Sequence, residues 1–248
     1  MAEGGRWIEV AGGVFARRYR ELDQTLGLVV GRTGCVVVDT GTDETHGAEF
    51  AAAIREVTEL PWTVVITHAH FDHFFGTAAF SPCAVWAHER CAVALADSDG
   101  DRRTWMRRYR EQGRPELADR LGDARLVMPT DLFTDRVRLD LGGRVVDLIH
   151  PGPAHTDHDV MVHVPDAAVV FAGDLVEQGA APSVGSDAHV DRWPAALDLL
   201  LALRPETVVP GHGEPVGPGF VLAQRDELQK PKSPKPPMSP PPKSPPPP

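Results

Sequence analysis

Short apolar runs broken by glycine-containing turns dominate the first part of the chain. Such runs are typical of β-strands. Between two of them, residues 45–59 carry apolar side chains at Phe50, Ile54 and Val57, a spacing that predicts an amphipathic helix. Residues 88–121 also favour helix, with interruptions at Gly113 and Pro115. The strands predicted in this half are 14–19, 26–31, 35–39, 62–67 and 83–87.

The second part of the chain repeats this alternation. Runs 137–141 and 145–149 flank Gly142 and Gly143, a pair that accepts positive φ and predicts a hairpin. Strand followed by helix occurs in both parts, which suggests two similar halves without a literal repeat. The remaining elements predicted here are strands 160–164, 169–172 and 207–209 and helices 191–203 and 221–228.

Length and composition predict one globular α/β domain followed by a tail. The 248 residues are 42% hydrophobic and 24% charged, which is enough for a sizeable core. We assign residues 1–229 to this domain and 230–248, made of Lys, Ser, Pro and one Met, to a disordered tail. A solubilising role is the favoured interpretation of the tail, and a proline-motif-binding partner is the alternative.

The charge and the cysteines narrow the classes of partner. A formal net charge of −10 disfavours nucleic acid as a partner. No segment is apolar over the length that a membrane span needs, and the N-terminus lacks the apolar stretch of a signal peptide. Three cysteines without a Cys-x-x-Cys motif predict no disulfide framework. We therefore expect a cytoplasmic protein with neither nucleic acid nor membrane as a partner.

The segment that follows predicted strand 62–67 is the strongest chemical signal. It carries His68, His70, Asp72 and His73 within six residues. In an extended loop, side chains two positions apart point the same way, so His68 and His70 can bind one ion. Asp72 and His73 fall where the loop turns, which directs them to a second position nearby. A histidine-rich loop without metal is the alternative, but such clusters usually mark metal or catalytic sites.

Four more polar residues follow apolar strands, each in a loop that contains glycine or proline. They are Asp39, His155, Asp174 and His212. Ligands gather at strand ends in α/β sheets, and glycine allows close backbone approach there. Packing alone does not explain so many His and Asp residues at strand ends.

In their order along the chain, these residues resemble the motif set of the metallo-β-lactamase superfamily, and the resemblance spans about residues 7–228. It implies an αββα sandwich, in which two mixed sheets pack face to face with helices outside. It also implies two Zn²⁺ ions, with iron or manganese possible because both accept imidazole and carboxylate. The implied ligands are His68, His70 and His155 for one ion, Asp72, His73 and His212 for the other, and Asp174 for both. Asp39 would orient the ligand loop by hydrogen bonds.

The resemblance implies a dinuclear zinc-dependent hydrolase. A metal-bridging hydroxide would attack the carbonyl of an ester, thioester, lactone or β-lactam, and Asp72 would orient the water and take up its proton. Glu177 stands where class B β-lactamases that bind the drug's carboxylate carry a lysine, so it would repel that group. The first group of class B β-lactamases has cysteine at the position of Asp174. Aspartate at this position resembles the metal sites of glyoxalase II and lactonases.

Other readings remain open at this point. One is an iron-dependent sulfur or persulfide oxidoreductase of the same fold, although a single iron would leave Asp72, His73 and His212 without a role. Nucleases of this fold and a non-catalytic metal-binding protein are further alternatives. The arginine-rich segment 102–120 is either a lid that attracts an anionic substrate or a solvated helix face, and the second is favoured.

Overall fold

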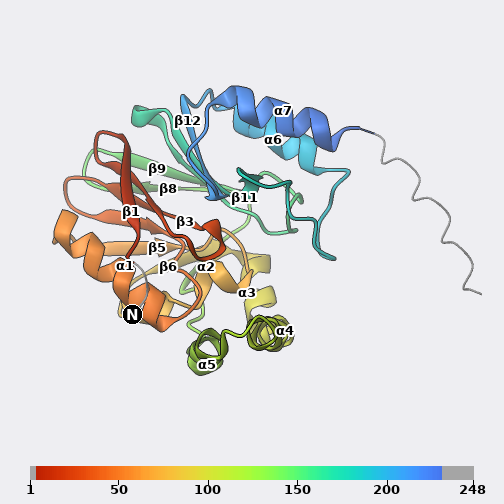
Figure 1. The fold of residues 1–248 in the computed structure, drawn as a ribbon. Coiled ribbons are helices and arrows are strands. Elements are labelled where there is room, and N and C mark those ends of the chain that lie inside the picture. The colour runs from red at the N-terminus through yellow and green to blue at the C-terminus, as the bar shows by residue number, and fades with distance from the viewer. Residues whose placement is uncertain (1–3, 231–248) are drawn as a thin grey trace, which may run out of the picture.

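The computed structural model describes residues 4–230. Two β-sheets lie face to face at the centre, with helices on their outer sides (Figure 1), so the predicted αββα sandwich is confirmed. The first sheet has seven strands in chain order: β1 (Arg6–Ala11), β2 (Val14–Arg18), β3 (Thr25–Val30), β4 (Cys35–Val38), β5 (Trp62–Val65), β6 (Val85–His88) and β7 (Asp131–Phe133). The second has five, ordered from one edge: β12 (Thr207–His212), β11 (Val169–Glu177), β10 (Met161–Val164), β9 (Val145–Ile149) and β8 (Arg136–Asp140).

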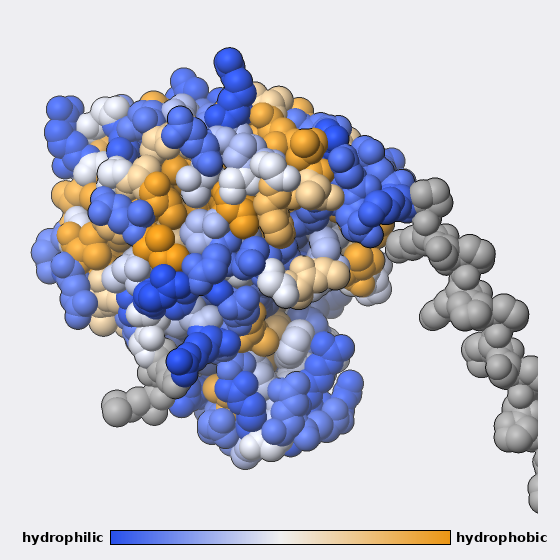
Figure 2. Space-filling model, turned by 45° about the horizontal axis from the view of Figure 1, so that its top comes forward, coloured by the Kyte–Doolittle hydropathy of each residue, from blue (hydrophilic) through white to orange (hydrophobic). Residues whose placement is uncertain are grey.

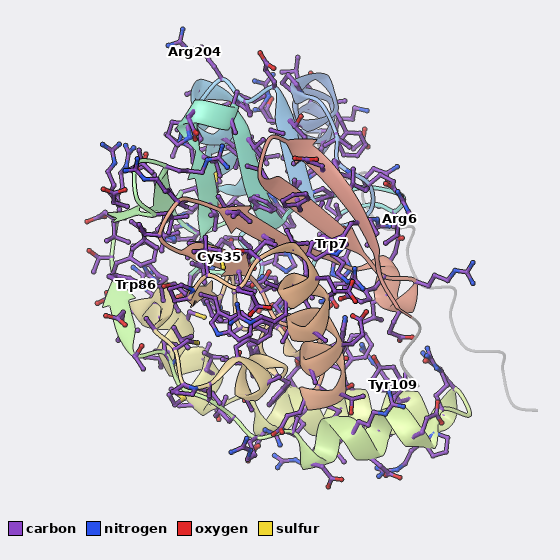
Figure 3. All side chains as sticks on the ribbon, turned by 90° about the vertical axis from the view of Figure 1, so that its left-hand side faces the viewer. Arg6, Trp7, Cys35, Trp86, Tyr109 and Arg204 are labelled. Atoms are coloured by element: carbon purple, nitrogen blue, oxygen red, sulfur yellow. The ribbon has the colours of Figure 1, made fainter. Side chains whose placement is uncertain are left out.

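Three apolar clusters hold these layers together. The central cluster joins the inner faces of both sheets and is rich in valine, whose branched side chain packs well on a pleated surface. A second cluster fills the space between the first sheet and its helices, where Cys35 lies within the molecule (Figure 3). The third joins the second sheet to α6 (Trp193–Ala202) and α7 (Pro218–Leu228), with Trp193 fully buried and its indole N–H donating to the Leu175 carbonyl.

Strand direction brings the polar loops together. Strands β4, β5, β6 and β7 pair in parallel, as do β11 and β12. The carboxyl ends of parallel strands lie at the same edge of a sheet, which is where such sheets place their ligands. The loops after β4 and β5, the segment after β9 and the ends of β11 and β12 therefore supply the polar residues identified in the sequence.

Two predicted strand ends are wrong. The sequence pattern predicted that β11 ends at residue 172 and β12 at residue 209. In the structure, β11 continues to Glu177 and β12 to His212. Glycine and proline looked like terminators, whereas the parallel pairing resumes after register shifts and joins Glu177 to His212. Asp174 and His212 thus lie within irregular strands, not in loops. Glycine is required at Gly211, because a Cβ there would lie 1.9 Å from Asp174 Oδ1.

The helical part of the first half differs in detail from the expectation. The helix predicted at 45–59 is α1 (Glu44–Val57). The stretch 88–121, predicted with interruptions at Gly113 and Pro115, has a further break at residues 97–98 and divides into three helices. These are α3 (Glu89–Ala96), α4 (Asp99–Glu111) and α5 (Pro115–Asp123). The short α2 (Phe71–Phe74) and the strands β1 and β7 were not predicted. The tail predicted at 230–248 lies outside the described part, apart from Lys230.

The surface carries mixed polarity. In Figure 2, hydrophilic residues dominate the lower lobe, which is where Figure 1 places α4 and α5. In Figure 3, Arg6 and Arg204 project outward from the body of the molecule. Between residues 4 and 230, no helix combines the length and apolar character that crossing a bilayer requires.

Candidate metal centre

The turn after β5 contributes four side chains to two neighbouring groups. His68 lies three residues beyond the strand, and His70 stands at the N-cap of α2, so Asp72 and His73 fall inside that short helix. The extended segment and the helix face different ways, which separates the four residues into two pairs. The spacing of the motif thus produces the division that the sequence indicated.

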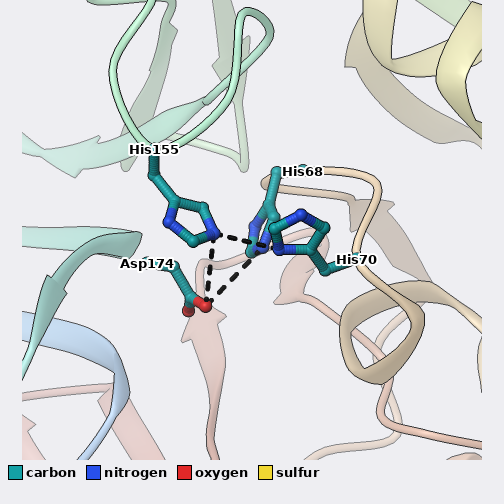
Figure 4. Close-up of side chains that lie close together, drawn as sticks. All are labelled: His68, His70, His155 and Asp174. Atoms are coloured by element: carbon teal, nitrogen blue, oxygen red, sulfur yellow. Dashed lines mark hydrogen bonds and ion pairs between the residues drawn. The ribbon is translucent and has the colours of Figure 1, made fainter. Parts of the chain in front are cut away.

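The first group combines three imidazoles with one carboxylate (Figure 4). Ligand atoms of His68, His70, His155 and Asp174 all lie within 4.8 Å of one another. Asp174 Oδ2 is 3.7 Å from His68 Nε2 and 3.6 Å from His155 Nε2. His70 Nδ1 is 3.0 Å from His155 Nε2. Four convergent N and O donors match the donor set of a zinc site.

The second group adjoins the first, and Asp174 of the first group contacts it. Ligand atoms of Asp72, His73 and His212 lie within 4.8 Å of one another. His212 Nε2 is 3.3 Å from both Asp72 Oδ2 and Asp174 Oδ2, and His73 Nε2 is 3.4 Å from Asp174 Oδ1. The Asp174 carboxylate therefore stands between the two groups, with an oxygen directed to each.

Asp39 holds this arrangement from behind. Its Oδ1 accepts the Thr67 backbone N–H at 2.7 Å, and its Oδ2 accepts the Thr67 hydroxyl at 2.7 Å. The same Oδ2 accepts Nδ1–H of His73 at 2.8 Å, which turns Nε2 of His73 toward the metal groups. The backbone of Asp39 has φ = 60°, a conformation that Asp tolerates better than most residues. Asp39 thus contacts the ligand loop both at Thr67 and at His73.

Two supporting contacts were not foreseen. His70 Nε2 donates to Asp187 Oδ2 at 2.9 Å, and this carboxylate comes from the connection between β11 and α6. His212 Nδ1 donates at 2.8 Å to the Leu22 carbonyl in the 3₁₀ turn Glu21–Asp23. Each bond turns the opposite ring nitrogen toward the metal groups. Neither partner carries a motif, so the sequence offered no signal for them.

The chain's own hydrogen bonds leave the facing atoms unsatisfied. His68 Nε2, His73 Nε2 and Asp174 Oδ1 are buried and have no hydrogen-bond partner. Native proteins rarely bury polar atoms without partners unless an ion or water takes that place. His70 donates Nε2–H to Asp187. The lone pair of its Nδ1 is therefore directed at the first group, beside His155 Nε2. The residues present therefore fit divalent metal.

Protonation differs between the two groups. Burial lowers the pKa of His155 to about 4 and holds the pKa of His68 well below its ordinary value. Burial also acts against charge on His212, but the carboxylates of Asp174 and Asp72 outweigh it and raise its pKa to about 12. Neutral imidazole is the form that binds metal. Despite burial, the carboxylate of Asp187 raises the pKa of His70 in the first group as well. Ion binding at the second group must therefore displace protons that His68 and His155 do not hold.

A cleft of about 960 Å³ opens above both groups. It is lined by ligand residues, by an apolar wall in which Phe71 stacks on Trp105 at 4.4 Å, and by several carboxylates. Glu177 lies there, 4% exposed, and its two oxygens accept the N–H and hydroxyl of Ser183 at 2.7 and 2.9 Å. The other carboxylates in the lining, apart from the ligands, are Asp23, Asp97, Asp101 and Asp187.

The arginines of segment 102–120 divide between surface and cleft. Arg107 lies near Glu111 and Arg110 pairs with Asp119, both on the solvated side of the helices, as the favoured interpretation holds. Arg108 instead lines the cleft, with its guanidinium 4.7 Å from the centre of the Trp105 ring. A single cationic side chain from this segment therefore faces the space above the metal groups.

Comparison with known proteins identifies the family. The family described as Metallo-beta-lactamase superfamily matches residues 20–212. A metallo-beta-lactamase type 2 from Bacillus sp. (strain 170) is 29% identical over 210 residues, covering 82% of this chain and 72% of that protein. An acyl-coenzyme A thioesterase from Homo sapiens is 28% identical over 201 residues, covering 75% and 71%.

Solved structures agree on the fold. A metallo-beta-lactamase from Pontibacter korlensis has a TM-score of 0.71 at 22% identity, covering 91% of this chain and 99% of that one. The family match extends from the residue before the 3₁₀ turn Glu21–Asp23 to the last residue of β12, so it includes every residue of the two metal groups. The chain belongs to the metallo-beta-lactamase superfamily, and it is a metal-dependent hydrolase.

Proposed function

We propose that the chain is a dinuclear zinc-dependent hydrolase of small carbonyl compounds, with an ester, thioester, lactone or β-lactam bond as its target. The observation that supports this most is the pair of adjoining ligand groups that share Asp174. Their all His and Asp composition suits zinc, and it also accepts iron or manganese. His68, His70 and His155 would hold one ion, and Asp72, His73 and His212 the other.

When bound, two such ions lower the pKa of water and polarise a carbonyl oxygen, so hydrolysis needs no serine or cysteine nucleophile. The chain's residues position the reactants. Asp72 lines the cleft, and its carboxylate lies 3.3 Å from His212 Nε2. From there Asp72 would orient the attacking water and take its proton. The Phe71–Trp105 wall would hold the apolar part of the substrate against the metal groups.

The charge of the cleft argues for a substrate without a carboxylate near Glu177. Burial and the nearby Asp174 carboxylate raise the pKa of Glu177 to about 7, so this side chain, whose two oxygens accept hydrogen bonds from Ser183, carries its negative charge above neutral pH. A substrate anion placed beside it would be repelled across a partly desolvated gap. Known relatives include a β-lactamase and an acyl-coenzyme A thioesterase. We therefore favour ester, thioester or lactone hydrolysis as the principal activity, with β-lactam hydrolysis as a weak one.

The alternative activities have less support. A mononuclear iron oxidoreductase would leave Asp72, His73 and His212 clustered without an ion. A non-catalytic metal-binding protein would not need an open cleft above its ligands. The cytoplasmic location, the small-molecule partner and a proline-motif-binding partner for residues 230–248 stay predictions from the sequence.

A hydrolysis panel tests the proposal. Purified protein loaded with zinc is assayed against a neutral nitrophenyl ester, an acyl thioester, a lactone and a carboxylate-bearing β-lactam. We expect turnover of at least one of the first three, its loss on chelation and in His68→Ala, and its return when zinc is added to the chelated wild type. Absence of metal-dependent turnover across the panel, or full activity in His68→Ala, would contradict the proposal.

A further inference from the structure

His158 is a histidine close to the metal groups that belongs to neither of them. It follows His155 by three residues, is 5% exposed, and is absent from both clusters of ligand atoms found among residues 4–230. Its ring nitrogens are nevertheless both engaged. One contacts the loop that carries His68 and His70, and the other contacts its own loop.

The hydrogen bonds define which nitrogen carries the proton. The Ala69 backbone N–H donates to His158 Nε2 at 3.1 Å, so this nitrogen acts as the acceptor. The proton must then reside on Nδ1, which lies 2.8 Å from Asp157 Oδ1 and donates to it. Asp157 is anchored in turn by Arg90, whose guanidinium lies 3.6 Å from the carboxylate and donates to the Asp157 carbonyl at 3.3 Å.

The place of Ala69 gives this chain of bonds its significance. Ala69 is the residue between His68 and His70, and its N–H belongs to the peptide group that joins it to His68. His158 belongs to the loop that delivers His155. One side chain therefore ties together the two separate segments that supply all three imidazoles of the first group.

We propose that His158 is a positioning residue that fixes the spacing of His68, His70 and His155 and thereby sets the affinity of the first metal position. The inference rests on the metal site proposed above. His158 does not coordinate the ion, and it acts through the Ala69 N–H. Groups that orient ligands in this way change metal affinity by about 10-fold to 100-fold when they are removed.

The proposal is tested by removing the hydrogen-bond acceptor of the Ala69 N–H, restoring it with another side chain, and measuring metal affinity in each variant. In His158→Ala, we expect one of the two zinc ions to bind about 10-fold to 100-fold more weakly in a chelator competition. His158→Gln should recover most of that loss, because its carboxamide oxygen can take the place of Nε2 and accept the Ala69 N–H. The matched control is His163→Ala, which removes a neighbouring buried histidine from β10 without touching the ligand loops. The Co²⁺ absorption spectrum, which reports ligand geometry, should change in His158→Ala and not in the control.

Several results would overturn the idea. Wild-type affinity for both ions in His158→Ala would do so, and so would a glutamine variant as weak as the alanine variant. If His158→Ala does not fold, Asp157→Ala supplies the test, because this half-exposed side chain anchors Nδ1–H without filling the core. Binding of the same ion should weaken, by less than about tenfold, and unchanged affinity would refute the positioning role of His158. A wild type that binds a single ion would contradict the dinuclear proposal while leaving the role of His158 testable on that ion.

Discussion

Replacing Asp39 by asparagine should weaken zinc binding at the second metal position while leaving the fold intact. Asparagine tolerates the positive φ of this residue and keeps its volume, so the backbone has no reason to move. The change converts one carboxylate oxygen into an amide that donates two hydrogens. Asparagine has a single oxygen, whereas Asp39 accepts from Thr67 N–H, from the Thr67 hydroxyl and from His73 Nδ1–H.

The magnitude follows from this loss. If the asparagine oxygen keeps the Thr67 N–H, its amide faces His73 Nδ1, and two donors oppose one another. The ring then favours the other tautomer, with the proton on Nε2, which is the nitrogen directed at the metal group. Losing such an orienting carboxylate costs about 10-fold to 100-fold in metal affinity, equivalent to about 1.4–2.8 kcal/mol.

A chelator competition measures this directly. We expect Asp39→Asn to bind its weaker zinc ion about 10-fold to 100-fold less tightly, with a matching drop in turnover at limiting zinc. The matched control is Asp43→Asn, also buried, whose carboxylate caps α1 by accepting from the backbone N–H groups of Thr45 and His46. Asparagine caps a helix about as well as aspartate, so this variant should bind zinc normally. Equal zinc affinity in Asp39→Asn and the wild type would refute the reasoning.

Three further predictions concern substrate charge and pH. Glu177→Lys should lower KM for a carboxylate-bearing β-lactam about tenfold without improving a neutral ester, and an equal change for both substrates would exclude an electrostatic cause. Arg108→Ala should raise KM for an anionic ester several-fold while Arg107→Ala leaves it unchanged, and equal values in steady-state kinetics would show that neither reaches the substrate. Burial raises the pKa of Asp159 to about 7, above the ordinary 3.8, so the folded protein retains a proton that the unfolded chain releases between these values. The free energy of unfolding of metal-free protein, measured with urea, should therefore fall more steeply from about pH 4 to pH 7 in the wild type than in Asp159→Asn. The same pH dependence in both proteins would contradict the raised pKa of Asp159.

The sequence predicted those parts of the molecule that depend on local pattern. Apolar runs located most strands, and the motif from His68 to His73 showed both its position after β5 and its division into two pairs. Strand β7 was not predicted because its three residues are too few to show a periodicity. The outer strand β1 was not predicted because it is only partly buried, which weakens the alternation of apolar and polar residues.

Long-range contacts could not be predicted in this way. Asp187 lies 117 residues from His70, in a stretch of mostly small residues that resembles an ordinary loop. The Leu22 carbonyl is a backbone atom, and any residue in that turn could supply it. The continuation of β11 and β12 through glycine and proline depends on pairing between the two strands, which a local pattern does not contain.

The most direct test of the central claim is the metal content of the purified protein by plasma mass spectrometry, measured for the wild type and for His212→Ala. Because His212 belongs only to the second ligand group, the account predicts close to two zinc ions per chain, falling toward one in the variant. A single iron per chain, unchanged in His212→Ala, would contradict the dinuclear hydrolase and direct attention to the oxidation of sulfur compounds.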